Sequence, residues 1–195
     1  MIIRFICCFL PTAGRFRKWF SHLDRQHAIP TIHGVSIHPP PSLVGFRSSR
    51  IKSLLDSGTT IICDRYAFSG IAFSASKALL QKPSTSASSQ LTYEWCRAPD
   101  VSLPAPDLTL FLDISPEQAS KQREGYGEER YEKLEMQACV REIFGRIGKE
   151  MGTEKWVTID ASRAREEVEK DIWEKVSPLV EGVNEPVSRL WKDLF

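Results

Sequence analysis

The chain has 195 residues, of which 42% are hydrophobic and 26% are charged, and its formal net charge is +1. This length and apolar content suffice for one α/β domain with a well-formed core. A net charge near zero argues against a nucleic-acid groove, which needs concentrated lysine and arginine. No apolar run approaches the ~20 residues of a membrane-spanning helix. We therefore expect an intracellular protein, of the cytoplasm or also of the nucleus, without a stable nucleic-acid or membrane partner.

Cysteine and histidine spacings do not indicate a metal site. The five cysteines stand at positions 7, 8, 63, 96 and 139 and show no paired ligand spacing. Such a pattern is typical of reduced, mostly buried thiols of an intracellular protein. The four histidines, all between positions 22 and 38, are spaced too loosely for a zinc site.

The first 50 residues predict only partial structure. Residues 2–10 predict a strand, and Arg4 inside this apolar run argues against a signal peptide or membrane anchor. Residues 11–23 predict a helix with aromatic side chains on one side. Residues 29–42 contain four prolines and no apolar period, so we expect them to be irregular or disordered.

A buried strand is predicted at residues 59–63, after the last turns of a helix that ends near Gly58. Its continuous β-branched run is typical of a parallel strand that is covered on both faces. Ligands of such sheets gather at the carboxyl ends of the strands, where Asp64 and Arg65 fall. An acid and an arginine at this place suit a metal ion and a phosphate. The alternative is that Asp64 and Arg65 only cap the next helix and form a local ion pair.

The middle of the chain predicts a loop, a strand and a helix start. Residues 82–90 are serine-rich without an apolar period, which indicates a surface loop. A strand is predicted at 108–112, after a proline-containing break. Ser115 then serves as a helix cap, with Pro116 in the first turn and Glu117 near the positive end of the helix.

The last third predicts two helices around a final strand. Residues 132–149 form a helix whose broad apolar face consists of Leu134, Met136, Ala138, Val140, Ile143, Phe144 and Ile147. Residues 156–160 form the last strand, and residues 165–180 form the closing helix. The side chains of this closing helix that we expect to face the core are Val168, Ile172, Trp173 and Val176.

Residues 64–73, which read DRYAFSGIAF, resemble the signature of thymidylate kinases of the eukaryotic type, the enzymes that transfer the terminal phosphoryl group of ATP to dTMP. Residues 94–113 are similar to the family's connection into its next strand. Residues 123–132, with Gln137, are similar to its mobile lid and the following helix. The resemblance covers about residues 51–195, including the closing stretch from Pro186 to Lys192.

This resemblance implies a three-layer α/β fold of the P-loop kinase type with a parallel sheet, truncated or altered in its N-terminal part. Residues 1–50 would form an atypical, partly irregular segment. Residues 51–195 would form the kinase-like domain, with its lid at about 121–131. ATP and dTMP are the implied substrates, Mg²⁺ is the implied cofactor, and a homodimer is implied as in the family.

The catalytic roles follow from the matching positions. Phosphoryl transfer needs charge neutralisation, alignment of the two nucleotides and exclusion of water. The resemblance places Asp64 near the phosphates and the magnesium ion, which it holds indirectly. It assigns Arg65 to the dTMP phosphate, and Arg123 of the lid to ATP and the transferring phosphoryl group. For residues 123–130, a solvated helix end with mixed charges is the alternative interpretation.

The resemblance also implies residues that bind the two nucleotides. Those on the dTMP side are Gly70, Phe73, Tyr131 and Gln137, in addition to Arg65. The loop beside the adenine of ATP contains Asp160, Ala161, Ser162 and Arg163. Because aromatic residues at helical spacing are more often part of a core, Phe73 has a strong structural alternative.

The N-terminal part departs from the family. A nucleoside monophosphate kinase opens with a strand, a phosphate loop G-x-x-x-x-G-K-[ST] and a helix. The glycines before residue 58 are Gly14, Gly34 and Gly45, and none precedes a lysine. Phe46 and Arg47 lie near the place of the family's thymine-reading residues, but the prolines at 39–41 and Val44-Gly45 do not fit the helix expected there. We therefore transfer no role to them.

Two functional hypotheses follow. The first is an ATP-dependent thymidylate kinase, a phosphotransferase of dTDP and dTTP biosynthesis. The second is a non-catalytic nucleotide-binding or interaction relative, which the missing phosphate loop favours. For residues 1–50, a gene model with a missing exon or a shifted reading frame is our first explanation, and natural divergence is the second. We expect the chain as written to transfer phosphoryl groups weakly or not at all.

Overall fold

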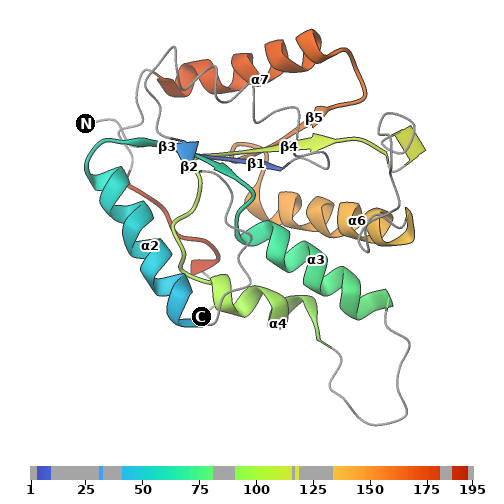
Figure 1. Ribbon diagram of the computed structural model, residues 1–195, viewed down its shortest axis with the longest axis horizontal. Coiled ribbons are helices and arrows are strands. Elements are labelled where there is room, and N and C mark those ends of the chain that lie inside the picture. The colour runs from blue at the N-terminus through green and yellow to red at the C-terminus, as the bar shows by residue number, and fades with distance from the viewer. Residues whose placement is uncertain are drawn as a thin grey trace.

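The structure, a computed structural model, describes residues 4–9, 31–32, 41–80, 91–115, 117–118, 134–180 and 186–192. Within these ranges, five parallel strands form one sheet in the order β2-β3-β1-β4-β5 (Figure 1). Their bounds are Arg4–Phe9 for β1, Thr31–Ile32 for β2, Thr60–Asp64 for β3, Leu108–Asp113 for β4 and Trp156–Asp160 for β5.

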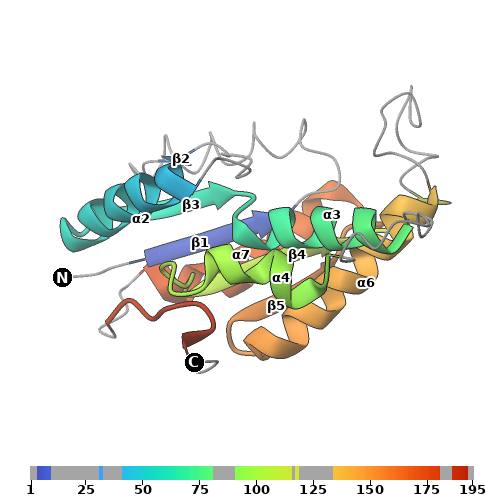
Figure 2. The ribbon, with the colours of Figure 1, turned by 90° about the horizontal axis from the view of Figure 1, so that it is seen from below.

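Helices cover both faces of this sheet. The helices are α2 (Pro41–Asp56), α3 (Ala67–Leu80), α4 (Tyr93–Arg97), α6 (Leu134–Met151) and α7 (Arg165–Val180), with a short 3₁₀ turn, η1, at Ala98–Asp100. Helix α7 lies on one face, and α3 and α6 lie on the other, with α4 beside α3 (Figures 1 and 2). The predicted three-layer α/β fold with a parallel sheet is therefore confirmed.

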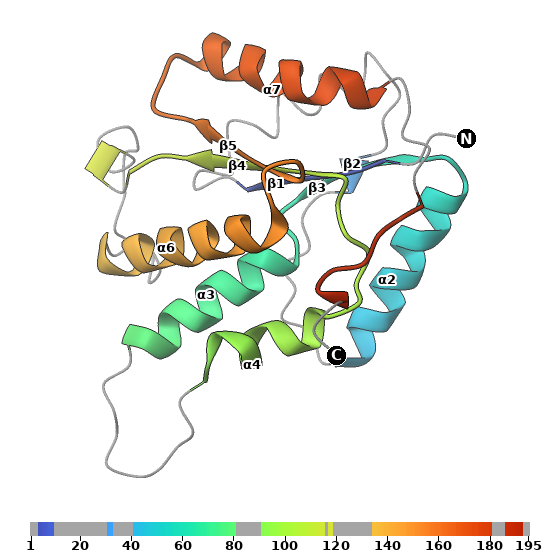
Figure 3. The ribbon, with the colours of Figure 1, turned by 180° about the vertical axis from the view of Figure 1, so that it is seen from behind.

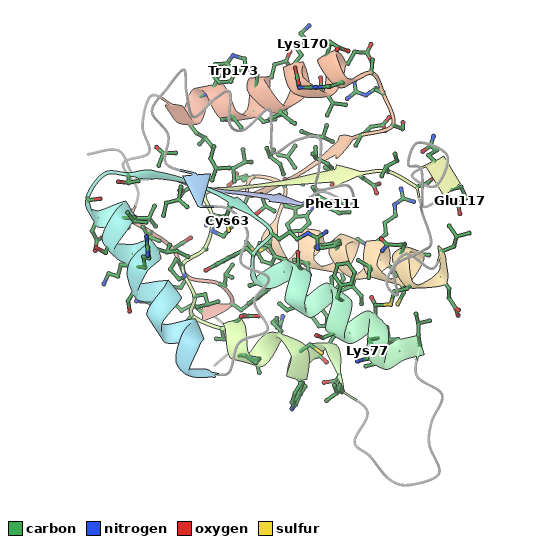
Figure 4. All side chains as sticks on the ribbon, viewed as in Figure 1. Cys63, Lys77, Phe111, Glu117, Lys170 and Trp173 are labelled. Atoms are coloured by element: carbon green, nitrogen blue, oxygen red, sulfur yellow. The ribbon has the colours of Figure 1, made fainter. Side chains whose placement is uncertain are left out.

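The core has one apolar cluster on each side of the sheet. In β4, Leu110 and Leu112 pack on the α7 side, whereas Phe111 lies on the other side, between the sheet and α6 (Figure 4). In the same way, Ile62 of β3 faces α7 while Ile61 packs on the opposite side. Both faces of β3 and β4 thus meet apolar side chains, which explains the continuous hydrophobic runs in these two segments of the sequence.

The element boundaries in the second half of the chain match the sequence predictions closely, but three side chains on two helices were wrongly predicted to face the core. Trp173 is 38% exposed on the outer side of α7 (Figure 4), beside the buried stripe of Val168, Ile172 and Val176. Leu134 is 50% exposed, and Ala138 is also exposed. Both lie roughly opposite the buried stripe of α6 that contains Met136, Val140 and Ile147.

The prediction that residues 29–42 are irregular is wrong in two places. Thr31–Ile32 form β2, which pairs in parallel with Ile62 and Cys63 of β3. Helix α2 begins at Pro41, since proline is well suited to a first helical position, and it runs through Val44 and Gly45. Those two residues therefore do fit a helix.

The strand predicted at residues 2–10 is confirmed over Arg4–Phe9, between β3 and β4. The predicted helix at 11–23 and the predicted loop at 82–90 lie outside the described residues. Cys63 and Cys96 are buried free thiols, as expected, and Cys139 is a half-buried one. Of the helices in the described ranges, none is long and apolar enough to cross a membrane.

Candidate functional site

The carboxyl ends of the parallel strands bring acidic residues to one edge of the sheet. In the strand register, Asp64 at the end of β3 stands opposite Cys8 of β1. Asp113 at the end of β4 stands opposite Asp160 at the end of β5. Ligands of open parallel sheets bind outside this edge. The residues predicted to bind the dTMP phosphate, at the end of β3, and those predicted to bind ATP, at the end of β5, therefore both lie where ligands are expected.

Arg65 occupies a sharp turn between β3 and α3. Its φ is 66°, in the left-handed region, which costs a residue with a side chain about 1–2 kcal/mol. The thiol of Cys63 donates to the carbonyl oxygen of Arg65 at 3.0 Å, and the Ser69 amide donates to the carbonyl of Tyr66 at 3.1 Å. These bonds hold the turn on both sides of Arg65. Strained backbone that neighbouring contacts maintain is typical of ligand sites.

The predicted dTMP-side residues of α3 lie next to this turn. The guanidinium carbon of Arg65 is 5.9 Å from the ring centroid of Phe73, which is cation–π distance. Gly70 is three residues before Phe73, so both lie on the same side of α3, and both are half-buried. Phe73 also packs against the apolar cluster beneath α3, so its structural and functional interpretations are compatible.

The other predicted dTMP-side and lid residues are only partly placed. Gln137 is half-buried on α6, the helix that packs against α3. Arg123 and Tyr131 lie outside the described residues, together with the rest of the predicted lid. The structure therefore brings together Arg65, Gly70 and Phe73 of the predicted site.

The loop after β5 is held by its own side chains. Asp160 Oδ1 accepts from the Ser162 amide at 2.9 Å and from the Ser162 hydroxyl at 2.6 Å, and these bonds lower the pKa of Asp160. Arg163 forms an ion pair with Asp171 of α7, which raises the pKa of the arginine. The Ala161 amide donates to the carbonyl of Asp113 at 2.8 Å. The predicted adenine-side loop thus has a defined shape and is tied to the end of β4.

Sequence reasoning missed an ion pair at the end of β4. Both carboxylate oxygens of Asp113 accept from Arg141 of α6, at 2.7 and 2.6 Å. This fork geometry is the strongest form of such a pair, and it raises the pKa of Arg141. The available signal was that β3, β4 and β5 each end in aspartate. The Ser115 hydroxyl accepts from the Gln118 amide at 3.2 Å, which is the bond expected of the predicted cap.

A family model described as thymidylate kinase matches residues 45–172. The chain belongs to the thymidylate kinase family. Among curated relatives, the thymidylate kinase of Arabidopsis thaliana is 43% identical over 147 residues, which is 74% of this chain and 49% of that protein. That of Schizosaccharomyces pombe is 46% identical over 125 residues, covering 63% of this chain and 53% of the relative. The human one is 38% identical over 143 residues, covering 73% and 61%.

A solved structure, the thymidylate kinase of Candida albicans, superposes with a TM-score of 0.77 at 25% identity, over 97% of this chain and 99% of that one. In contrast, the sequence matches leave much of each curated relative uncovered. The chain spans about half the length of the first two curated relatives that it matches. The family match includes the β3–α3 turn, the Asp113–Arg141 pair and the loop after β5.

Two of the acidic residues at the strand ends, Asp113 and Asp160, already have protein partners, so a metal ion here would be held mainly by phosphate oxygens. Among the described residues, no group of three or more His, Cys, Asp or Glu side chains is arranged to hold a metal ion. Asp113 uses both carboxylate oxygens for Arg141, and Asp160 uses one for Ser162. Mg²⁺ in phosphoryl-transfer sites commonly needs only one or two carboxylates besides phosphates and water. The family's use of ATP, generally with Mg²⁺, is compatible with this donor set.

Proposed function

We propose that this thymidylate kinase family member transfers the γ-phosphoryl group of ATP to dTMP and so forms dTDP, a precursor of dTTP. The observation that carries this proposal is the strained turn at the end of β3. There Arg65 has a φ of 66° and its side chain lies over Phe73. A cation fixed at the carboxyl edge of a parallel sheet suits an anionic ligand. The family match over residues 45–172 supports the choice of nucleotides.

On the acceptor side, we infer that Arg65 binds the dTMP phosphate through charge-assisted hydrogen bonds. Its guanidinium is restrained by the Phe73 ring, so less side-chain entropy is lost when the phosphate binds. Gly70, without a side chain, lets the nucleotide approach the helix backbone. We assign Tyr131 to the deoxyribose and Gln137 to a further nucleotide contact, following the family resemblance.

On the donor side, we infer that the loop 160–163 lies beside the adenine of ATP. Its internal bonds from Ser162 to Asp160 keep the loop in one conformation, which reduces the cost of ordering it on binding. Arg123 supplies positive charge to the phosphoryl group as it is transferred. When bound, Mg²⁺ would neutralise and orient the ATP phosphates, and Asp64 is the residue we assign next to it.

A non-catalytic nucleotide-binding relative is the second candidate, and one observation favours it. The 195 residues contain no G-x-x-x-x-G-K-[ST] motif, the sequence that usually forms the backbone cradle for the phosphates and supplies its lysine. Phosphoryl transfer depends on positioning and charge neutralisation, to which that loop contributes. We therefore expect dTMP binding by this chain to persist while transfer is weak.

The test is to measure both properties on the purified chain. ADP release with dTMP, ATP and Mg²⁺ reports transfer, and calorimetry reports binding of each nucleotide. Turnover near 1 s⁻¹, about the low end of ordinary kinases, would support the first candidate and contradict weak transfer. Specific dTMP binding without turnover supports the second. A chain that binds neither nucleotide would contradict both.

Two cheaper observations complement this test. A coding stretch for glycine-lysine-serine or glycine-lysine-threonine in the genomic DNA upstream of the Ile51 codon would indicate that the gene model lacks a segment. We also propose a homodimer, on the family resemblance. Sedimentation equilibrium should then give twice the chain mass of 22.1 kDa.

A further inference from the structure

The C-terminal residues 186–192, here called the C-terminal strap, lie along residues 102–105, which precede β4 (Figure 3). The Ser102 amide donates to the carbonyl of Leu190 at 2.9 Å, and the Leu190 amide donates to the carbonyl of Leu103 at 2.9 Å. The Ala105 amide donates to the carbonyl of Ser188 at 2.8 Å. Leu190 is only 1% exposed, so the strap is part of the packed domain.

Within this pairing, Pro104 stands opposite Arg189 in an antiparallel bridge. The backbone bonds join the residues on either side of this pair, so the pair itself exchanges none. A proline is tolerated in such a position because no N–H is needed. For the same reason, the carbonyl of Pro104 is not used by the strap and can accept another donor.

That donor is the hydroxyl of Tyr66, which reaches the carbonyl oxygen of Pro104 at 3.1 Å in a buried position. Tyr66 is the residue after Arg65 and is only 2% exposed. A second link runs through aromatic rings. Tyr66 meets Phe68 edge-on at 6.2 Å between centroids, and Phe68 meets Trp191 of the strap edge-on at 5.8 Å.

We propose that Tyr66 and the C-terminal strap are positioning elements for Arg65. The left-handed backbone of Arg65 is unfavourable by itself, so neighbouring contacts must maintain it. Cys63 holds the turn on its strand side through the Arg65 carbonyl, and the Tyr66–Pro104 bond holds it on its helix side. The C-terminal strap thereby helps to fix the direction in which the chain runs from β3 through Arg65. This inference rests on the proposed function only in assigning the dTMP phosphate to Arg65.

The chain offers a matched control for Tyr66. Tyr93 of α4 is also buried, and its hydroxyl donates to Glu150 Oε2 at 2.9 Å. The hydroxyl bond of Tyr93 runs to α6, whereas that of Tyr66 runs to the segment before β4. If the Tyr66 hydroxyl only stabilised the fold, removing either hydroxyl would have the same kind of effect.

The experiment compares Tyr66→Phe, Tyr93→Phe and the unmodified chain by hydrogen exchange, with the Ser69 amide as reporter because it bonds to the Tyr66 carbonyl. We expect Tyr66→Phe to speed exchange at Ser69 by about tenfold, the effect of one lost buried hydrogen bond, and to leave the amides of β5 unchanged. Tyr93→Phe should leave Ser69 unchanged. In calorimetry, Tyr66→Phe should weaken dTMP binding by roughly fivefold and ATP binding not at all.

Arg189→Ala tests the strap itself, because the exposed Arg189 side chain donates to the Ser102 carbonyl at 2.9 Å. It should speed exchange at Ser69 in the same direction but less than Tyr66→Phe. Unchanged exchange at Ser69 in Tyr66→Phe, or equal changes in both tyrosine variants, would overturn the inference. If the unmodified chain binds no dTMP, the proposed function fails, while the exchange at Ser69 still decides whether Tyr66 holds the turn.

Discussion

The guanidinium of Arg65 and the ring of Phe73 meet across two turns of α3, with 5.9 Å between the guanidinium carbon and the ring centroid. Arg65 leaves the strand end from a left-handed backbone, and Phe73 lies along the helix that follows. The contact directs a cation along α3 at the edge of the sheet where ligands bind. Through this contact Phe73, which also packs against the core, acts directly on the arginine that we predict to bind the phosphate.

Phe73→Leu should therefore weaken dTMP binding by about two- to fivefold, the size of a cation–π contact at a partly exposed site. Leucine keeps most of the apolar packing against the α3 cluster, so we expect the free energy of unfolding to fall by about 1 kcal/mol or less. Calorimetric titration with dTMP and urea unfolding measure the two effects separately. Unchanged dTMP affinity would show that Phe73 serves the core alone.

Arg65→Ala should weaken dTMP binding by roughly ten- to a hundredfold, because charge-assisted hydrogen bonds to the phosphate are lost. Alanine faces the same backbone strain at this φ, so the change reports the side chain. ATP binding should be little affected. Arg146→Ala is the control, since Arg146 is an arginine of α6 that pairs with Glu94 and not with the strand ends. Equal losses for dTMP and ATP in Arg65→Ala would mean that Arg65 is structural.

Elements with a strong local signal could be predicted from the sequence to the residue. Strand β5 and helix α7 have the predicted bounds, because a short run rich in aromatic and β-branched residues defines the strand and a clear helical period defines the helix. Strand β2 was missed because two residues carry no period, and it exists through pairing with β3. Trp173 was predicted to face the core because it is apolar. It is exposed because it lies beside the buried stripe of α7 and not within it.

At the site, residue types could be predicted but their partners could not. Asp64, Arg65 and Asp160 stand at strand ends, as the apolar runs before them indicated. The bond from Tyr66 to Pro104 joins residues 38 apart in the chain, and the pair of Asp113 with Arg141 joins residues 28 apart. Such contacts depend on how the strands are ordered in the sheet, which no local pattern encodes.

Helix α6 offers a pair of glycines whose replacement should have opposite effects. A methyl group added at Gly148 would lie 2.7 Å from Nε1 of Trp156, a buried ring of β5. Gly148→Ala should therefore lower the free energy of unfolding by about 1–3 kcal/mol, because the tightly packed indole must shift. Gly145 has no atom within 4 Å of the same position. Gly145→Ala should stabilise the helix by about 0.5–1 kcal/mol. Urea unfolding measures both effects. A change of the same sign in the free energy of unfolding of both variants would contradict the packing at Gly148.

The buried hydroxyl of Tyr93 should make stability fall at alkaline pH. Burial, and then the hydrogen bond to Glu150, raise the pKa of Tyr93 well above its usual value. In the unfolded chain this phenol loses its proton near pH 10. Above that pH the folded state binds more protons than the unfolded state, so stability decreases as the pH rises. Below pH 10 both states keep the proton and the contribution is constant.

Urea unfolding between pH 8 and 11 measures this effect, with Tyr93→Phe as the control. The free energy of unfolding of the unmodified chain should fall more steeply above pH 10 than that of Tyr93→Phe, because only the former can ionise at this position on unfolding. The difference between the two chains removes the titration of lysines and of the other tyrosines. Parallel pH profiles would mean that the hydroxyl of Tyr93 ionises as readily in the folded chain as in the unfolded one, contrary to its burial beside Glu150.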